Sequence, residues 1–234
     1  MDVSLTWLML HGAQTYRIRV LLFRLFMSEG HLQAVYNTAK KEGVEEPNES
    51  QVNILRMASE RIHTFAQQEQ RPGVVSDIIS LTDVHFMIAL LAHLFRCIEK
   101  QTELSENRTQ GLFVLLDLFG DLTSCVSDCP TIQNGIFEAN LSLLCIGKIS
   151  TSWIFSSNSP DMLRRLSDDK PGEGIKGLKV NLVRILGNIS YKHFPTQEQI
   201  RTAGGIEILL SHSKIDPTNE CMFMYMYPRN SNQA

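Results

Sequence analysis

The sequence predicts an all-α fold in which successive helices stack as a solenoid of helical repeats. Apolar residues recur at helical spacing along most of the chain, and polar segments separate the resulting stretches. A short motif also recurs at the ends of several stretches. Period-2 alternation over the length of a strand is hard to find. Helices of this kind must bury their apolar faces against one another.

Four stretches carry apolar stripes typical of amphipathic helices, at residues 18–26, 52–66, 84–98 and 112–122. In a fifth stretch, residues 141–149, apolar side chains leave almost no polar face, which predicts a helix packed on several sides. Polar segments rich in helix breakers are expected to connect the helices, at residues 41–50, 67–73, 99–111, 127–135 and 156–177.

Two local signals support this organisation. Ser80 followed by Asp83, just before the third stripe, predicts a weak form of the capping box. Pentapeptides of one form, apolar-Gly-polar-Leu/Ile-hydroxyl, begin at Phe119, Ile146 and Leu186. The last two begin 40 residues apart, a spacing typical of armadillo and HEAT arrays, whereas the first two are 27 apart.

Residues 177–216 show the plan of one armadillo unit. A long apolar helix ends near Tyr191, a short helix is expected over 197–202, and Ala203-Gly204-Gly205 precedes another apolar helix. Glycines permit a sharp turn there, because they enter left-handed backbone conformations without steric cost. The predicted fold is therefore an armadillo-like (ARM/HEAT) α-solenoid.

Residues 175–216 resemble the C-terminal domain of the ataxin-10 family. Gly187-Asn188-Ile189, Tyr191-Lys192, Gly205-Ile206 and Ile215-Asp216 stand where that family has its characteristic residues. The resemblance implies a cytoplasmic, non-catalytic protein-binding scaffold. It also implies roles in neurite outgrowth, neuronal survival and cytokinesis, with a G-protein β subunit and an O-linked N-acetylglucosamine transferase among the partners.

The resemblance suggests a division into irregular armadillo-like repeats (1–155), a linker (156–174), an incomplete ataxin-10-type unit (175–216) and a divergent, unstructured tail (217–234). After Asp216 the family's Asn-Pro-Phe turn and tryptophan helix are replaced by other residues. We therefore expect a fragment, a splice form or a truncated gene model. The alternative function is an inert or regulatory product in which the helix beginning at Ile206 lacks its cover.

Asn188 is the candidate binding residue, with Arg184 one helical turn before it. In many armadillo proteins an asparagine at this place lines the concave face, and its carboxamide can donate to and accept from a peptide backbone. The companion tryptophan place holds Arg184 here, which removes the stacking wall of importin-like binding. A structural role for Asn188 at a helix junction stays open beside the binding role.

Enzyme chemistry is not visible in the sequence. Gly172, Gly174 and Gly177 match the G-x-G-x-x-G dinucleotide fingerprint, but a polar segment stands where that motif needs a strand. Cys125 and Cys129 lack two further ligands for zinc. His85 and His93 have no carboxylate between them, and no cysteine–histidine pair is evident. We expect no cofactor and no metal; an unrelated helical enzyme or regulatory subunit is the remaining hypothesis.

The charge, hydropathy and cysteine content limit the classes of partner and the compartment that we expect. A net charge of −3 and a pI of 6.2 give no electrostatic reason to expect nucleic acid. No apolar run approaches the ~20 residues of a membrane span, and five cysteines without paired spacing point to a reducing compartment. We therefore expect a cytoplasmic protein that binds other proteins, and a homo-oligomer is left open.

Overall fold

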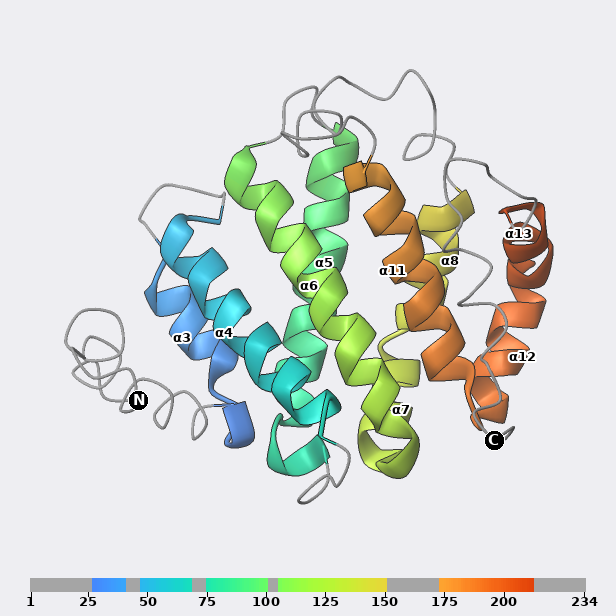
Figure 1. Cartoon of the computed structure of the whole chain (residues 1–234), viewed down its shortest axis with the longest axis horizontal. Coiled ribbons are helices and arrows are strands. Elements are labelled where there is room, and N and C mark those ends of the chain that lie inside the picture. Colours follow the sequence, from blue (N-terminus) through green and yellow to red (C-terminus); the bar gives the residue numbers. More distant parts are fainter. Residues whose placement is uncertain (1–26, 41–46, 69–74, 101–104, 151–172, 213–234) are drawn as a thin grey trace. The chain divides into compact units, whose positions relative to one another are not determined.

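The computed structural model describes residues 27–40, 47–68, 75–100, 105–150 and 173–212 (Figure 1). All regular secondary structure in these ranges is helical, which confirms the predicted all-α helical-repeat class. The chain divides into two compact units, residues 1–139 and 140–234. The helix predicted over 18–26 and the tail from residue 217 lie outside the described residues.

The N-terminal unit is built from helices that pack on their neighbours. Helix α4 packs along α6, α5 contacts α6 and α7, and α3 contacts α4 and α5 (Figure 1). The predicted helices at 52–66, 84–98 and 112–122 are confirmed as α4, α5 and α6. The elements are α3 (Leu32–Thr38), α4 (Glu49–Ala66), η2 (Val75–Asp77), α5 (Leu81–Lys100), α6 (Glu106–Cys125), η3 (Val126–Asp128) and α7 (Pro130–Glu138).

Two helix starts in this unit show different capping. At α4 the box is complete, because Asn48 Oδ1 accepts the Gln51 N–H at 3.0 Å and Gln51 Oε1 accepts the Asn48 N–H at 3.1 Å. At α5 half of the predicted box forms, since Ser80 Oγ accepts the Asp83 N–H at 3.1 Å. The Asp83 carboxylate instead accepts the Leu32 N–H of α3 at 3.1 Å. Asp83 thus joins the first turns of two helices.

Four of the five predicted polar connections are partly helical, because helices begin within residues 41–50, 99–111, 127–135 and 156–177, and this corrects the sequence-based boundaries. Helix α6 begins at Glu106, because the Ser105 hydroxyl accepts the Arg108 N–H at 3.4 Å and caps it. Helix α7 begins at Pro130, whose fixed backbone angle suits a first helical position. Its buried apolar face consists of Ile132 and Ile136, which is too short a pattern to show periodicity.

The C-terminal unit contains α8 (Leu141–Ser150), α11 (Glu173–Ser190), α12 (Phe194–Thr202) and α13 (Gly205–His212). Helix α8 contacts α11, α12 and α13, and α12 contacts both α11 and α13 (Figure 1). The helices predicted in these four regions are confirmed. Helix α12 begins three residues earlier than expected, because His193 caps it and Pro195 stands in its first turn.

The recurring pentapeptide has the same local structure in both units. Its first and fourth residues are buried in each copy, as with Phe119 and Leu122 in α6 and Leu186 and Ile189 in α11. Its hydroxyl group donates to a backbone carbonyl of the same motif. Thr123 donates to Phe119 at 2.6 Å, with a longer contact of 3.3 Å to Gly120, and Ser190 donates to Gly187 at 3.0 Å. The motif therefore marks equivalent helix ends, as a helical repeat requires.

The turn between α12 and α13 uses its two glycines differently. Gly204 has φ +68°, which confirms the predicted left-handed turn. Gly205 is required by packing, because a Cβ there would lie 2.9 Å from the Ile200 carbonyl oxygen and 2.9 Å from Ile146 Cδ1. The second glycine therefore sets how closely α13 approaches α8.

Gly205→Ala is expected to destabilise the C-terminal unit by about 1–3 kcal/mol, because backbone and two isoleucines would have to shift. Gly147→Ala in α8 is the matched control, since nothing lies within 4 Å of a Cβ there. It should stabilise by about 0.5–1 kcal/mol, the usual gain from removing a helix glycine. Urea unfolding followed by circular dichroism measures both; equal effects of the same sign would contradict the packing argument.

Candidate functional site on the C-terminal unit

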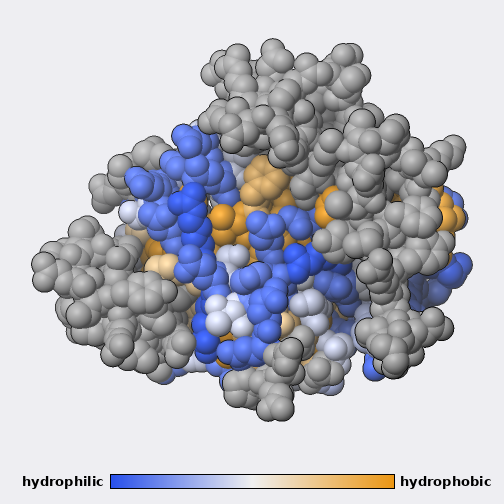
Figure 2. Space-filling model, viewed as in Figure 1, coloured by the Kyte–Doolittle hydropathy of each residue, from blue (hydrophilic) through white to orange (hydrophobic). Residues whose placement is uncertain are grey.

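Large hydrophobic side chains are exposed in the C-terminal unit, whereas the described residues of the N-terminal unit contribute none to this group. Figure 2 shows hydrophobic residues at the surface at its right-hand edge, where Figure 1 places α13. Exposed apolar surface of this kind marks interaction sites more often than chance. The exposed residues are Leu143 (39%), Tyr191 (55%), Phe194 (73%), Ile206 (46%) and Leu210 (59%).

Helix α11 has one buried side and one polar, partly exposed side. The buried side carries the apolar stripe of residues 178–189 that the sequence predicts. The other side carries Asn181, Arg184 and Asn188, all partly exposed, and continues just past the helix end to Tyr191. Their offsets of 0, 3, 7 and 10 place them on one side of a helix. We call these four residues the α11 face.

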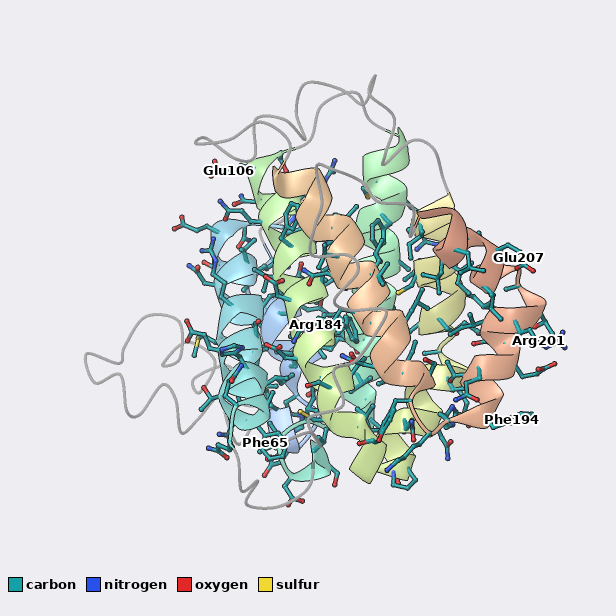
Figure 3. All side chains as sticks on the ribbon, turned by 45° about the vertical axis from the view of Figure 1, so that its right-hand side comes forward. Phe65, Glu106, Arg184, Phe194, Arg201 and Glu207 are labelled. Atoms are coloured by element: carbon teal, nitrogen blue, oxygen red, sulfur yellow. The ribbon has the colours of Figure 1, made fainter. Side chains whose placement is uncertain are left out.

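The two predicted binding residues therefore lie together, one turn apart near the middle and end of α11. Figure 3 shows Arg184 about half-way along the helix. Each side chain is partly exposed. A carboxamide, a guanidinium group with five donors and a phenol in one row can bind peptide backbone or acidic side chains.

The turn after α11 presents an aromatic side chain to solvent. Lys192 has φ +53°, and its ammonium group lies 5.1 Å from the centre of the Tyr191 ring. His193 is buried and its Nδ1 accepts the Thr196 N–H at 3.3 Å, which fixes the start of α12. Phe194 follows at 73% exposure, at the opposite end of α12 from Arg201 (Figure 3).

Asn188 can be compared with the residue at the same position of the recurring pentapeptide in α6. The equivalent residue in α6 is Asp121, which is buried and whose Oδ2 lies 2.7 Å from Nδ1 of His63 in α4. That position can therefore tie neighbouring helices. Asn188 is partly exposed where Asp121 is buried, so it offers more of its side chain to a ligand.

The sequence interpretation singled out Asn188 and Arg184 but not Asn181, Tyr191 or Phe194. Asn181 could have been found, since it stands seven residues before Asn188 on the same helix face. An aromatic residue in a polar turn before Pro195 was a weak signal for Phe194. Its exposure depends on tertiary packing.

The dinucleotide fingerprint does not form a glycine loop. Gly174 and Gly177 lie within helix α11, which begins at Glu173. Gly172 lies outside the described residues. A helical backbone at these glycines differs from the strand–turn–helix geometry that the motif requires.

Among the described residues, a cysteine and a histidine lie close together in a pair that the sequence interpretation missed. His93 Nε2 lies 3.4 Å from Cys97 Sγ on the outside of α5, at the i, i+4 spacing that brings side chains together. His85 instead contacts the Gly135 carbonyl oxygen at 3.2 Å. Cys125 and Cys129 are both buried, and within the described ranges no three His, Cys, Asp or Glu side chains are grouped to hold a metal ion.

The shifted pKa values fall outside the α11 face. Burial raises the pKa of Tyr36 to about 12 and also raises the pKa of the Cys145 thiol. Burial raises the pKa of Asp83 to about 6, although hydrogen bonds from the Leu32 and Gln33 amides oppose it. These groups are fixed by packing inside their units.

None of the helices that the structure describes has both the length and the apolar character needed to span a membrane.

Comparisons with known proteins agree on one family. A family model described as the spinocerebellar ataxia type 10 protein domain matches residues 178–225. An ataxin-10 homolog from Dictyostelium discoideum is 24% identical over 246 residues, which cover 74% of this chain and 40% of that protein. Ataxin-10 from Xenopus tropicalis is 28% identical over 115 residues, which cover 45% of this chain and 22% of that protein. No solved structure matches.

The chain spans less than half the length of either relative. The matched domain contains most of α11, all of α12 and α13, and nine residues beyond Asp216, where the resemblance seen in the sequence stopped. The α11 face thus lies within the matched domain, and the chain is similar to ataxin-10 proteins over that domain and over the aligned parts of the two relatives.

Proposed function

We propose that this chain is a non-catalytic scaffold of the ataxin-10 type, and that it binds other proteins through the α11 face together with Phe194. The observation that supports the proposal most is the 73% exposure of Phe194 beside a capped helix start. A large aromatic side chain held outward at a fixed corner loses little conformational entropy on binding. Aromatic and arginine residues also dominate the energetics of protein interfaces.

The row of polar residues beside Phe194 suggests how a partner would be oriented. Asn181 and Asn188 can each donate to and accept from a peptide unit, and Arg184 suits a carboxylate. Tyr191, 55% exposed, stands between this row and Phe194 in the sequence. The proposed surface thus combines an apolar anchor with a polar row, as protein interfaces commonly do.

Similarity to the ataxin-10 family supports the finer part of the proposal. We propose a cytoplasmic protein with the family's roles in neurite outgrowth, neuronal survival and cytokinesis. The candidate partners are a G-protein β subunit and an O-linked N-acetylglucosamine transferase.

The test measures binding of the purified chain to each purified candidate partner by surface plasmon resonance. Phe194→Ala should weaken binding at least tenfold while leaving the melting temperature unchanged, because the side chain is exposed. Arg184→Ala should weaken binding by a smaller factor. Leu143→Ala in α8 is the matched control, since it removes an exposed apolar side chain outside the proposed surface.

The variant Asn188→Ala distinguishes a binding role of Asn188 from a structural role at a helix junction. Weaker binding at unchanged melting temperature supports the binding role, whereas a lower melting temperature with binding intact supports a structural role like that of Asp121. Wild-type affinity for both partners in the Phe194 and Arg184 variants, or no binding by the wild-type chain, would contradict the proposed surface and partners.

A further inference from the structure

Helix α13 carries a second exposed apolar surface, apart from the α11 face. Ile206 is 46% exposed and Leu210 is 59% exposed, and the two residues lie one helical turn apart. Leu209, three residues after Ile206, is partly exposed on the adjoining side. We call Ile206, Leu209 and Leu210 the α13 face.

The other side of α13 is already packed within the C-terminal unit. The helix contacts α8 and α12, and the Cα of Gly205 lies against the side chains of Ile146 and Ile200. The helix is therefore fixed by one side while its apolar α13 face is exposed. Apolar residues that recur on such a face usually mark a contact.

We propose that residues 221–227 of this same chain cover the α13 face. The segment reads Cys-Met-Phe-Met-Tyr-Met-Tyr and contains no charged residue. Methionine side chains are unbranched and adapt to irregular apolar surfaces, and aromatic rings provide large contact areas. Residues 221–227 thus match the apolar chemistry of the α13 face.

The connection between the end of α13 and residues 221–227 is long enough for these residues to reach the α13 face. Eight residues, 213–220, separate the end of α13 from the segment. An extended chain of that length reaches about 26–29 Å, whereas an eight-residue helix is about 12 Å long. Residues 221–227 can therefore return along the whole of α13, and intramolecular contact has the advantage of a high effective concentration.

The family match supplies an independent argument for this occupant. It runs from residue 178 to residue 225, so the family domain extends past α13 and into the proposed covering segment. A domain that continues through these residues is expected to use them in its own core. This favours the chain's own segment over a second copy or a foreign protein.

The proposal goes beyond the proposed function and does not depend on it. Phe194 lies at the far end of α12 from α13, so the two surfaces can be altered separately (Figure 3). Covering α13 completes the unit, and the α11 face stays available for a partner.

The first experiment follows hydrogen–deuterium exchange of the α13 amides in the full chain. The amides of residues 206–210 should be protected at all protein concentrations. A triple substitution, Met222→Ser, Phe223→Ser and Met224→Ser, should speed their exchange at least tenfold. The matched control, Asn230→Ser with Asn232→Ser, should not change it. Amides of α4 and α6 report whether each variant is folded.

The second experiment tests the contact from the other side. Cys221 lies in the covering segment, so its reaction with a thiol-alkylating reagent reports exposure of that segment. Leu210→Asp should speed alkylation of Cys221 at least tenfold, because a carboxylate on the α13 face repels an apolar segment. Glu207→Gln, an exposed change on the same helix, should leave the rate unchanged.

The outcomes decide between occupants. Protection of α13 that is lost in the triple variant, together with faster Cys221 alkylation in Leu210→Asp, supports the proposal. Unprotected α13 amides in the full chain would overturn it. Protection that grows with protein concentration would assign the surface to a second copy, and protection unchanged by the triple variant would equally contradict coverage by residues 221–227.

Discussion

Asp83→Ala is expected to lower the free energy of unfolding of the N-terminal unit by about 2–4 kcal/mol. The Asp83 carboxylate, fully buried, accepts the Leu32 N–H at 3.1 Å and also bonds the Gln33 amide at the start of α3. Alanine would leave these helix-end donors without that acceptor, and each unpaired buried donor is costly. Urea unfolding at pH 7 followed by circular dichroism measures the loss.

Asp83→Asn is the matched variant, because its carbonyl oxygen can still accept the Leu32 N–H while the side chain stays neutral at every pH. Burial raises the pKa of Asp83 to about 6, although the Leu32 and Gln33 amides, the Ser80 hydroxyl and the charge of His31 lower it. The folded wild-type chain therefore keeps a proton between about pH 4 and pH 6 that the unfolded chain has lost.

The sign of the pH effect follows from this difference in bound protons. The stability contributed by protonated Asp83 is fully present below about pH 4 and is lost as the pH rises through about 6. From pH 4 to pH 7 the wild-type chain should lose about 1–3 kcal/mol relative to Asp83→Asn. Parallel pH profiles of the two proteins would contradict the raised pKa, and an unchanged stability in Asp83→Ala would contradict the capping role.

Phe119→Ala should cost about 3–5 kcal/mol, the usual range for removing a large buried side chain and leaving a cavity. Phe119 in α6 is completely buried, and it opens the recurring pentapeptide at the end of that helix. Phe194→Ala is the matched control, since Phe194 is 73% exposed and its loss should change stability by less than about 0.5 kcal/mol. Thermal and urea unfolding of the two variants measure the contrast.

Similar losses in the two phenylalanine variants would show that the exposure of Phe194 does not persist in solution. That result would also remove the main support for the proposed binding surface. A loss confined to Phe119→Ala would leave Phe194 free for the binding measurements, because its substitution would then report on partners and not on folding.

The long helices could be predicted from the sequence because their apolar residues recur at a period fixed by the geometry of the helical backbone. The stripe at 84–98 lies in α5, and the stretch at 141–149 is almost the whole of α8. Helix α7 was missed because Ile132 and Ile136 make too short a pattern. The capping of α3 by Asp83 was missed because the two partners stand 51 residues apart.

The candidate site was predictable only in part. The likeness to armadillo repeats pointed to Asn188 and Arg184, and helix geometry puts both on one face of α11. The apolar stripe at 112–122 predicts that Phe119 is buried, whereas the local signal for an exposed Phe194 is only its polar turn before Pro195. The difference depends on which neighbouring helices reach each side chain.

The all-α class, the positions of the long helices and the resemblance to one family could be predicted from the sequence alone, because periodicity, turn glycines and motifs are local properties of the chain. The tertiary structure decided that α8 packs with α11 and α12, that Asp83 is buried between two helix starts, and that exposed apolar side chains gather in the C-terminal unit. Burial is a property of contacts between distant segments, and it follows only once those segments are packed together.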